Sequence, residues 1–215
     1  MVLSSNDIIE AFKSGDIAYS GAPSTDDKQA FNSWCKSFVQ PASLDVSIGY
    51  ETYGITAYVP RGQVNYTPMD DPGIDSRYHA TAHYTPLSMG KTLNRAVRVL
   101  PGQMILVNSE HRLKLSTSIA AQIVTRSTAR RWGWDVSGSA GWIDPGYDNY
   151  LTFCVQNTSI KPSWLFGGGE YAQLVFHRCD SAAKEYKGKY KLDGEWSPEQ
   201  MLPKPFPVDL TPKAE

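Results

Sequence analysis

Two stretches of this chain carry residue types that could bind a polyphosphate and activate water. Arg126, Ser127 and Arg131 come first, and their forked guanidinium groups and hydroxyl are donors suited to phosphate oxygens. Asp144 lies in a Trp-Ile-Asp-Pro-Gly segment, and its carboxylate could orient or activate a water molecule. Tyr147 follows three residues later and offers a flat face for a sugar ring. Together these residues indicate chemistry on a nucleoside triphosphate.

Each of these residues also has a structural interpretation. Asp-Pro-Gly is a turn sequence, in which the Asp144 carboxylate would accept hydrogen bonds from backbone amides. Arg126 and Arg131, taken alone, are typical of a solvated or salt-bridged surface. The pattern of the whole chain therefore has to decide between the two interpretations.

Short β-strands are the elements that must position these residues. Gly and Pro punctuate the sequence and separate segments rich in Val, Ile, Tyr and Thr, which predicts a mostly β sandwich or barrel. A short helix is expected at the amino terminus, where Ser4 or Ser5 can cap it and Gly15 can end it. The expected strands lie within 44–49, 104–108, 119–125, 150–156 and 171–177.

The sequence predicts one domain over residues 1–215. Residues 58–95 are polar and dotted with Pro and Gly, so we expect an insertion with poorly defined strands. Prolines and charges spread over 196–215 predict an extended tail, which could pack on a neighbouring subunit.

Composition narrows the functional classes. The net charge of -1 argues against bulk nucleic-acid binding, and no stretch is apolar enough to span a membrane. Three cysteines without a paired spacing are expected to be reduced thiols. The amino terminus lacks a secretory pattern, so we expect a cytoplasmic protein, in the host cytoplasm if the gene is viral.

Six ordered segments resemble the dCTP deaminase and dUTPase superfamily. The resemblance covers nearly the whole chain, and it is carried by the order of the motifs rather than by any single one. The matching segments are Ser4–Ala18, the Gln40–Gly49 strand "QPASLDVSIG", Leu100–Leu115, "RSTARRWG" at Arg126–Gly133, Gly168–Phe176 with "AQLVF", and "YKGKY" at Tyr186–Tyr190.

This resemblance implies a homotrimer of distorted β-sandwich or jelly-roll subunits, the dUTPase-like β-clip, with nucleotide sites between neighbouring chains. It also implies Mg²⁺ bound through the triphosphate and held near Asp45 through water. For Asp45 an equal alternative is a structural role, as a strand residue that hydrogen-bonds a neighbouring loop. Lys189 and Tyr190 would close over the phosphates, unless they simply end a polar strand. The implied triphosphate-binding residues are Arg126, Ser127, Arg131, Gln173, Lys189 and Tyr190.

The segment from Ala140 to Tyr147 resembles the dUTPase motif "AGVIDxxY". The resemblance implies that Asp144 orients the water that attacks the α-phosphate and that Tyr147 packs on the deoxyribose. Ala140, Gly141 and Asn157 are the further sugar- or base-binding positions that it implies.

Two residues depart from the family pattern. Active dCTP deaminases carry a glutamate ten residues after the aspartate, as a proton shuttle for the amine, and Cys154 stands there instead. A thiol is a poor shuttle for that step, so Cys154 is more simply interpreted as a small core residue. Glu170 occupies a position that is usually basic in the family.

Three hypotheses follow for a protein that acts on a deoxypyrimidine nucleoside triphosphate. The first is a Mg²⁺-dependent hydrolase of dUTPase type, which would release monophosphate and pyrophosphate. The second is a dCTP deaminase with a non-standard proton shuttle. The third is a catalytically inactive nucleotide-binding regulator or sponge.

Overall fold

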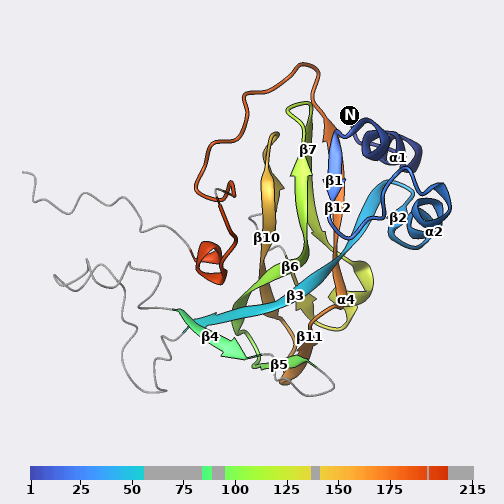
Figure 1. Ribbon diagram of the computed structural model, residues 1–215. Helices are drawn as coiled ribbons and strands as arrows, with labels where there is room; N and C mark the ends of the chain where they lie inside the picture. Colours follow the sequence, from blue (N-terminus) through green and yellow to red (C-terminus); the bar gives the residue numbers. More distant parts are fainter. Residues whose placement is uncertain (56–83, 89–94, 137–140, 193, 203–215) are drawn as a thin grey trace, which may run out of the picture.

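The computed structural model describes residues 1–55, 84–88, 95–136, 141–192 and 194–202. Strands dominate this part of the chain, and every strand pair in it is antiparallel (Figure 1). The mostly β class is therefore confirmed. The strands are β1 (Ile17–Tyr19), β2 (Val39–Gln40), β3 (Ser43–Ile55), β4 (Tyr84–Ser88), β5 (Ala96–Val99), β6 (Met104–Leu115), β7 (Ile119–Thr125), β8 (Trp134–Asp135), β9 (Trp142–Ile143), β10 (Asp148–Asn157), β11 (Ser163–Phe166) and β12 (Glu170–Arg178).

One long strand, β3, joins the two halves of the curled main sheet. Its first residues, 44–47, pair with β12, which continues through β7 to β9. After an irregularity between Ile48 and Thr52, residues 52–54 pair with β6, which continues through β10 to β8. The apolar side chains of both halves face one another and form one main core, and β5 and β11 make a separate small sheet.

Gly49 makes the change of partner in β3 possible. A Cβ atom at this position would lie 2.3 Å from Oδ1 of Asn108, so no side chain fits without moving that residue. The buried Asn108 amide uses this closeness, because its oxygen accepts the N–H of Glu51 at 3.0 Å. The close approach of β3 and β6 thus requires glycine at position 49. This position lies within the irregular pairing between Ile48 and Thr52.

Two of the helices, α1 (Ser5–Ser14) and α2 (Lys28–Phe38), lie together beside β1 and β2 (Figure 1). The predicted amino-terminal helix is confirmed as α1: Ser4 and Asp7 form a capping box, and Gly15 ends the helix with φ of 79°. Helix α2 and a further helix, α4 (Ser127–Arg131), were not expected from the sequence. None of the described helices is long and apolar enough to cross a membrane.

The predicted insertion and tail are only partly described. Within 58–95, β4 pairs with β3, while 58–83 and 89–94 lie outside the described residues. Within the tail, residues Pro198–Met201 form a 3₁₀ helix, η3, rather than an extended strap. This part packs on its own chain, since Met201 and Leu202 are buried against Tyr53 and Leu106. Residues 203–215 lie outside the described part.

The capping box of α1 gives a test of the fold. The Ser4 hydroxyl accepts the N–H of Asp7 at 3.3 Å, while no cap bond involves the Ser5 side chain. Ser4→Ala should therefore lower the free energy of unfolding by about 1 kcal/mol, measured by urea denaturation. Ser5→Ala is the matched control and should change it by less than about 0.5 kcal/mol. Equal effects of the two substitutions would contradict the assigned cap.

Candidate functional site

A cavity of about 320 Å³ collects four of the residues singled out in the sequence, the fourth being Tyr190. Asp144, Tyr147 and Cys154 all line it, although they come from the β9–β10 turn and the middle of β10. Its other walls come from β6, β7 and the chain after β12, including Tyr186, Tyr190 and Met201. The structure therefore brings the predicted water-activating residue and the predicted sugar-packing residue to one place.

The turn that carries Asp144 is held from three sides. Within it, the Tyr147 N–H donates to the Asp144 carbonyl at 3.2 Å. The Gly146 N–H reaches the Ser116 carbonyl at 3.1 Å, and Gly146 takes φ of 78°, which favours glycine. The Tyr186 N–H donates to the Pro145 carbonyl at 3.0 Å. The Asp144 side chain is exposed and forms no hydrogen bond or ion pair within the described chain, so the turn holds its shape without this carboxylate.

Tyr147 forms a rigid wall of the cavity. Its ring is buried, and its hydroxyl donates to the Tyr150 carbonyl at 2.7 Å. The ring centroid lies 5.9 Å from that of Tyr186. Burial raises the pKa of the Tyr147 hydroxyl, which therefore remains a neutral donor. The predicted packing of this ring on a sugar stays a prediction.

Cys154 faces the cavity rather than the main core. Side chains along β10 alternate, so the buried Phe153 and Val155 point into the sandwich while Cys154 points to the other side. There it packs beside Leu106, Met201 and Trp196, in a small apolar cluster under the tail. Cys154 thus packs against this smaller apolar cluster and also lines the cavity. Burial raises the pKa of its thiol, so the group is neutral near pH 7.

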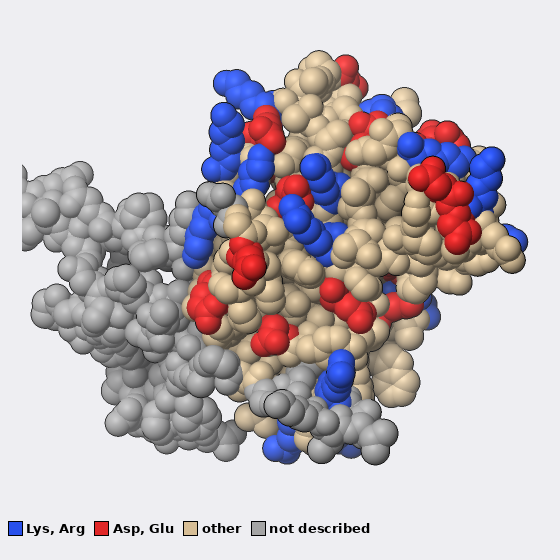
Figure 2. Space-filling view, viewed as in Figure 1, with Lys and Arg blue, Asp and Glu red and all other residues tan. Residues whose placement is uncertain are grey.

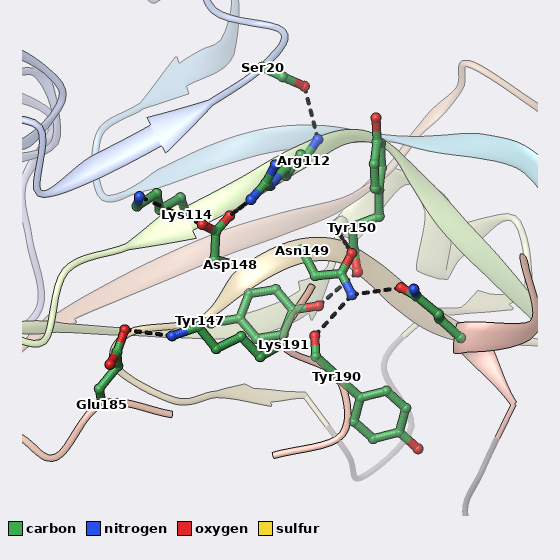
Figure 3. A network of polar contacts seen from close by, with 11 residues as sticks. Ser20, Arg112, Lys114, Tyr147, Asp148, Asn149, Tyr150, Glu185, Tyr190 and Lys191 are labelled. Atoms are coloured by element: carbon green, nitrogen blue, oxygen red, sulfur yellow. Dashed lines mark hydrogen bonds and ion pairs between the residues drawn. The ribbon is translucent and has the colours of Figure 1, made fainter. Parts of the chain in front are cut away.

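A polar network fixes β10 against the chain segment that covers the cavity (Figure 3). At the start of β10, Asp148 accepts from Arg112 at 2.7 Å, and the buried Asn149 donates to the Tyr190 carbonyl at 2.9 Å. Asn149 also donates to Gln200 of η3 at 3.3 Å. The segment after β12 and the start of the tail are therefore tied to the strand that carries Cys154.

Arg126 lies at a second cavity, of about 510 Å³. There its guanidinium group forms ion pairs with Asp45, at 3.2 Å, and with the carboxylate of Glu170. Asp45 is almost fully buried; burial raises the pKa of its carboxyl, and Arg126 opposes that shift. One oxygen of Asp45, Oδ1, is buried without a hydrogen-bond partner. Aromatic side chains, among them Trp132 and Trp164, form much of the remaining wall.

The other predicted triphosphate-binding residues are spread over the molecule. Ser127 and Arg131 lie exposed on α4, next to Arg126. Gln173 lies opposite Asp45 across β12 and β3 and accepts the Ser43 hydroxyl at 3.3 Å. In one chain, none of the residues lining the Asp144 cavity also lines the Arg126 cavity.

Lys189 and Tyr190 lie on the side of the Asp144 cavity. Tyr190 lines it, and the Lys189 ammonium donates to the Leu202 carbonyl at 2.5 Å, which ties the segment after β12 to the tail. Figure 2 shows basic side chains gathered at the upper left, over the segment that follows β12, with acidic ones among them.

Two implied sugar- or base-binding positions, Asn157 and Gly141, form hydrogen bonds within the chain. Asn157 is fully buried, and its amide donates to the Val99 and Lys161 carbonyls and accepts from Ser159. With these bonds Asn157 orders the turn after β10, and its role in binding a base stays a prediction. Gly141 accepts the Ile123 N–H at 2.7 Å, and Ala140 lies outside the described residues.

Comparison with known proteins identifies the family. Residues 2–179 match a family model described as dCTP deaminase-like. The chain belongs to the dCTP deaminase-like family. A "dCTP deaminase, dUMP-forming" of Nanoarchaeum equitans is 37% identical over 173 residues, which cover 75% of this chain and 84% of that protein. One of the same description from Methanopyrus kandleri is 27% identical and covers 93% and 95%.

The fold agrees with this assignment. A crystal structure of the 2′-deoxycytidine 5′-triphosphate deaminase from Agrobacterium tumefaciens superimposes with a TM-score of 0.54 at 17% identity. The match covers 83% of this chain and 48% of that one, so this chain spans about half of its length. The distorted sandwich predicted from the motifs is thereby confirmed as the fold of dCTP deaminase-like proteins. The curated relatives bear the names of nucleotide-processing enzymes.

Three residues at these cavities were not predicted to take part. Met201 lines the Asp144 cavity, Glu170 pairs with Arg126, and Tyr186 supports both Tyr147 and the Asp144 turn. The sequence contained a signal only for Glu170, because its charge is the reverse of the family pattern. Met201 could not be foreseen, since no local pattern shows that a tail folds back.

The pKa of Cys154 gives a measurable consequence in this family member. A raised thiol pKa leaves little thiolate at neutral pH, so alkylation of Cys154 by iodoacetamide should be slow at pH 7. Its rate should still rise above about pH 9, where an ordinary thiol of pKa near 8.5 is largely ionised. Site-resolved mass spectrometry measures this, with the Cys179 peptide as a check of the reagent. An alkylation rate of Cys154 that is already at its plateau near pH 7 would contradict the raised pKa of its thiol.

Proposed function

We propose that the protein hydrolyses a deoxypyrimidine nucleoside triphosphate to the monophosphate and pyrophosphate. The supporting observation is the chemistry of the described cavity wall: Asp144 is its one carboxylate and is not engaged by other protein groups. The position of the amine shuttle, Cys154, holds a neutral thiol. Attack of water on a phosphate therefore has a general base in Asp144. Proton transfer to and from the exocyclic amine lacks the general acid and base that it needs.

In this mechanism the Asp144 carboxylate accepts a hydrogen bond from a water molecule and receives its proton. The water oxygen forms a bond to the α-phosphorus, and the bond from the α-phosphorus to its bridging oxygen breaks, so that pyrophosphate leaves. The Tyr147 ring packs on the deoxyribose and fixes the reacting phosphate in line with the water. Arg126, Ser127 and Arg131 donate to the oxygens on which negative charge collects.

The separation of the two cavities supports an oligomer, and a homotrimer is part of this proposal. Asp144 and Arg126 line different cavities of one chain. If both act on the same triphosphate, the arginine must come from a neighbouring copy. Ser127 and Arg131 are exposed on α4 and can make such a contact.

Asp45, which pairs with Arg126 beside the Arg126 cavity, also fits magnesium held through the triphosphate. Asp45 Oδ1 is a buried acceptor without a partner, and such an atom can receive a hydrogen bond from a water of hydrated Mg²⁺. Bound there, the ion would neutralise phosphate charge. Within the described ranges, no group of three or more His, Cys, Asp or Glu side chains could hold a metal ion.

A second candidate is the whole conversion that the relatives' names describe. Going from dCTP to dUMP removes both an amine and two phosphates. The protein would need a substitute for the missing glutamate, and the described cavity wall offers only Asp144 as a further carboxylate. Ammonia release from dCTP would support this candidate, and tight binding without either product would identify a nucleotide-binding regulator.

Asp144→Asn tests the proposed hydrolysis. The amide cannot take the proton, so pyrophosphate release from dUTP or dCTP in the presence of Mg²⁺ should fall by roughly 10²–10⁴-fold. Because the carboxylate holds no other group, the thermal stability and oligomeric state should not change. Asp180→Asn, an exposed residue outside the cavity, is the charge-matched control and should keep full activity. Undiminished release by Asp144→Asn would rule out the proposed function.

Cys154→Glu tests the position of the lost amine shuttle. The new carboxylate would enter the cavity beside Leu106 and Met201, in apolar surroundings that raise its pKa and suit it to proton transfer. We expect this variant to release ammonia from dCTP, measured with a coupled ammonia assay, while the parent chain does not. Cys154→Gln introduces a side chain of the same size as glutamate and should release no ammonia. Ammonia release by the parent chain would instead support the second candidate.

A further inference from the structure

The Arg126 guanidinium group is held by two carboxylates of unequal accessibility. Its Nη2 lies 3.2 Å from Asp45, whose side chain is 2% exposed and which also accepts from Gln40 at 3.0 Å. Its Nη1 pairs with Glu170, whose side chain is 35% exposed. Nη1 also lies 3.4 Å from the Glu170 carbonyl. Asp45 is therefore a fixed partner, while Glu170 is the partner that solvent and ligands can reach.

The position of Glu170 gives it freedom to leave this pairing. It is the first residue of β12, directly after the Gly167–Gly169 turn, and the pairing with β3 is irregular between Glu170 and Ala172. Its carboxylate has no other hydrogen bond or ion pair among the described residues. Both Arg126 and Glu170 line the Arg126 cavity, so a ligand bound in it contacts the ion pair directly.

We propose that Glu170 is an internal competitor for phosphate at Arg126 and thereby sets how tightly this cavity binds a polyphosphate. This inference rests on the proposed function, in which Arg126 grips the triphosphate. Two carboxylates and one guanidinium group leave the trio with a net negative charge, which repels an anion. A phosphate group gains its bidentate pairing with Arg126 only when the Glu170 carboxylate moves away. Asp45 stays and keeps the guanidinium group in position.

The test uses the full-length chain and inorganic tripolyphosphate, which separates phosphate binding from turnover. Glu170→Gln removes the competing charge and should tighten binding by about tenfold in isothermal titration calorimetry at low salt without magnesium. The gain should shrink as ionic strength rises, because part of it is screened. Glu10→Gln removes a carboxylate from an exposed ion pair on α1 and controls for net charge. It should leave the affinity unchanged.

A second variant assigns the gain to Arg126. In the double variant Arg126→Ala/Glu170→Gln the tightening should disappear, since no guanidinium group remains to be released. Unchanged or weaker tripolyphosphate binding by Glu170→Gln would overturn the inference. So would a gain in affinity that persists in the double variant, or an absence of binding by both the parent chain and Glu170→Gln. Pyrophosphate release from a nucleotide remains a separate test, so hydrolysis can be confirmed even where this competition is not.

Discussion

The crossing of β3 between the two halves of the main sheet is the constraint on which the site depends. The start of the strand, with Asp45, belongs to the half that contains β12 and the Arg126 cavity. Its far end, with Tyr53, belongs to the half that contains β6 and packs under the tail near Cys154. A single continuous strand keeps these places apart. In one chain, the Asp144 cavity and the Arg126 cavity therefore share no lining residue.

The two cavities differ in how their carboxylates are paired. At the Arg126 cavity, a nearly buried aspartate is kept beside a guanidinium group, because an unpaired carboxylate there would be costly. At the other cavity, Asp144 is exposed and engages no protein group. The first arrangement holds a cation ready for an anionic ligand. The second leaves a carboxylate available for water.

The sequence predicted the elements whose signals are local. The cap at Ser4, the αL end at Gly15 and the apolar segment Ile119–Thr125 each fix an element without help from distant residues. Helix α2 also had such a signal, since Asp27 caps a run in which Phe31 and Cys35 are buried on one face, but the dense Gly and Pro punctuation on either side masked it. The site was predicted as a set of residues, whereas their division between two cavities depends on pairing between strands far apart in the chain.

The surroundings of Cys154 connect the departure from the family pattern to the path of the tail. A glutamate in this place would be buried under Met201 and Trp196, where an ionised carboxylate needs a polar partner that the described cluster does not offer. A thiol has no such requirement, and the apolar cluster can close over it. The aromatic contact between Trp196 and Tyr150, with ring centroids 5.0 Å apart, stabilises that closure. The thiol at position 154 and the apolar packing of the tail are thus compatible with one another, because neither leaves a buried charge without a partner.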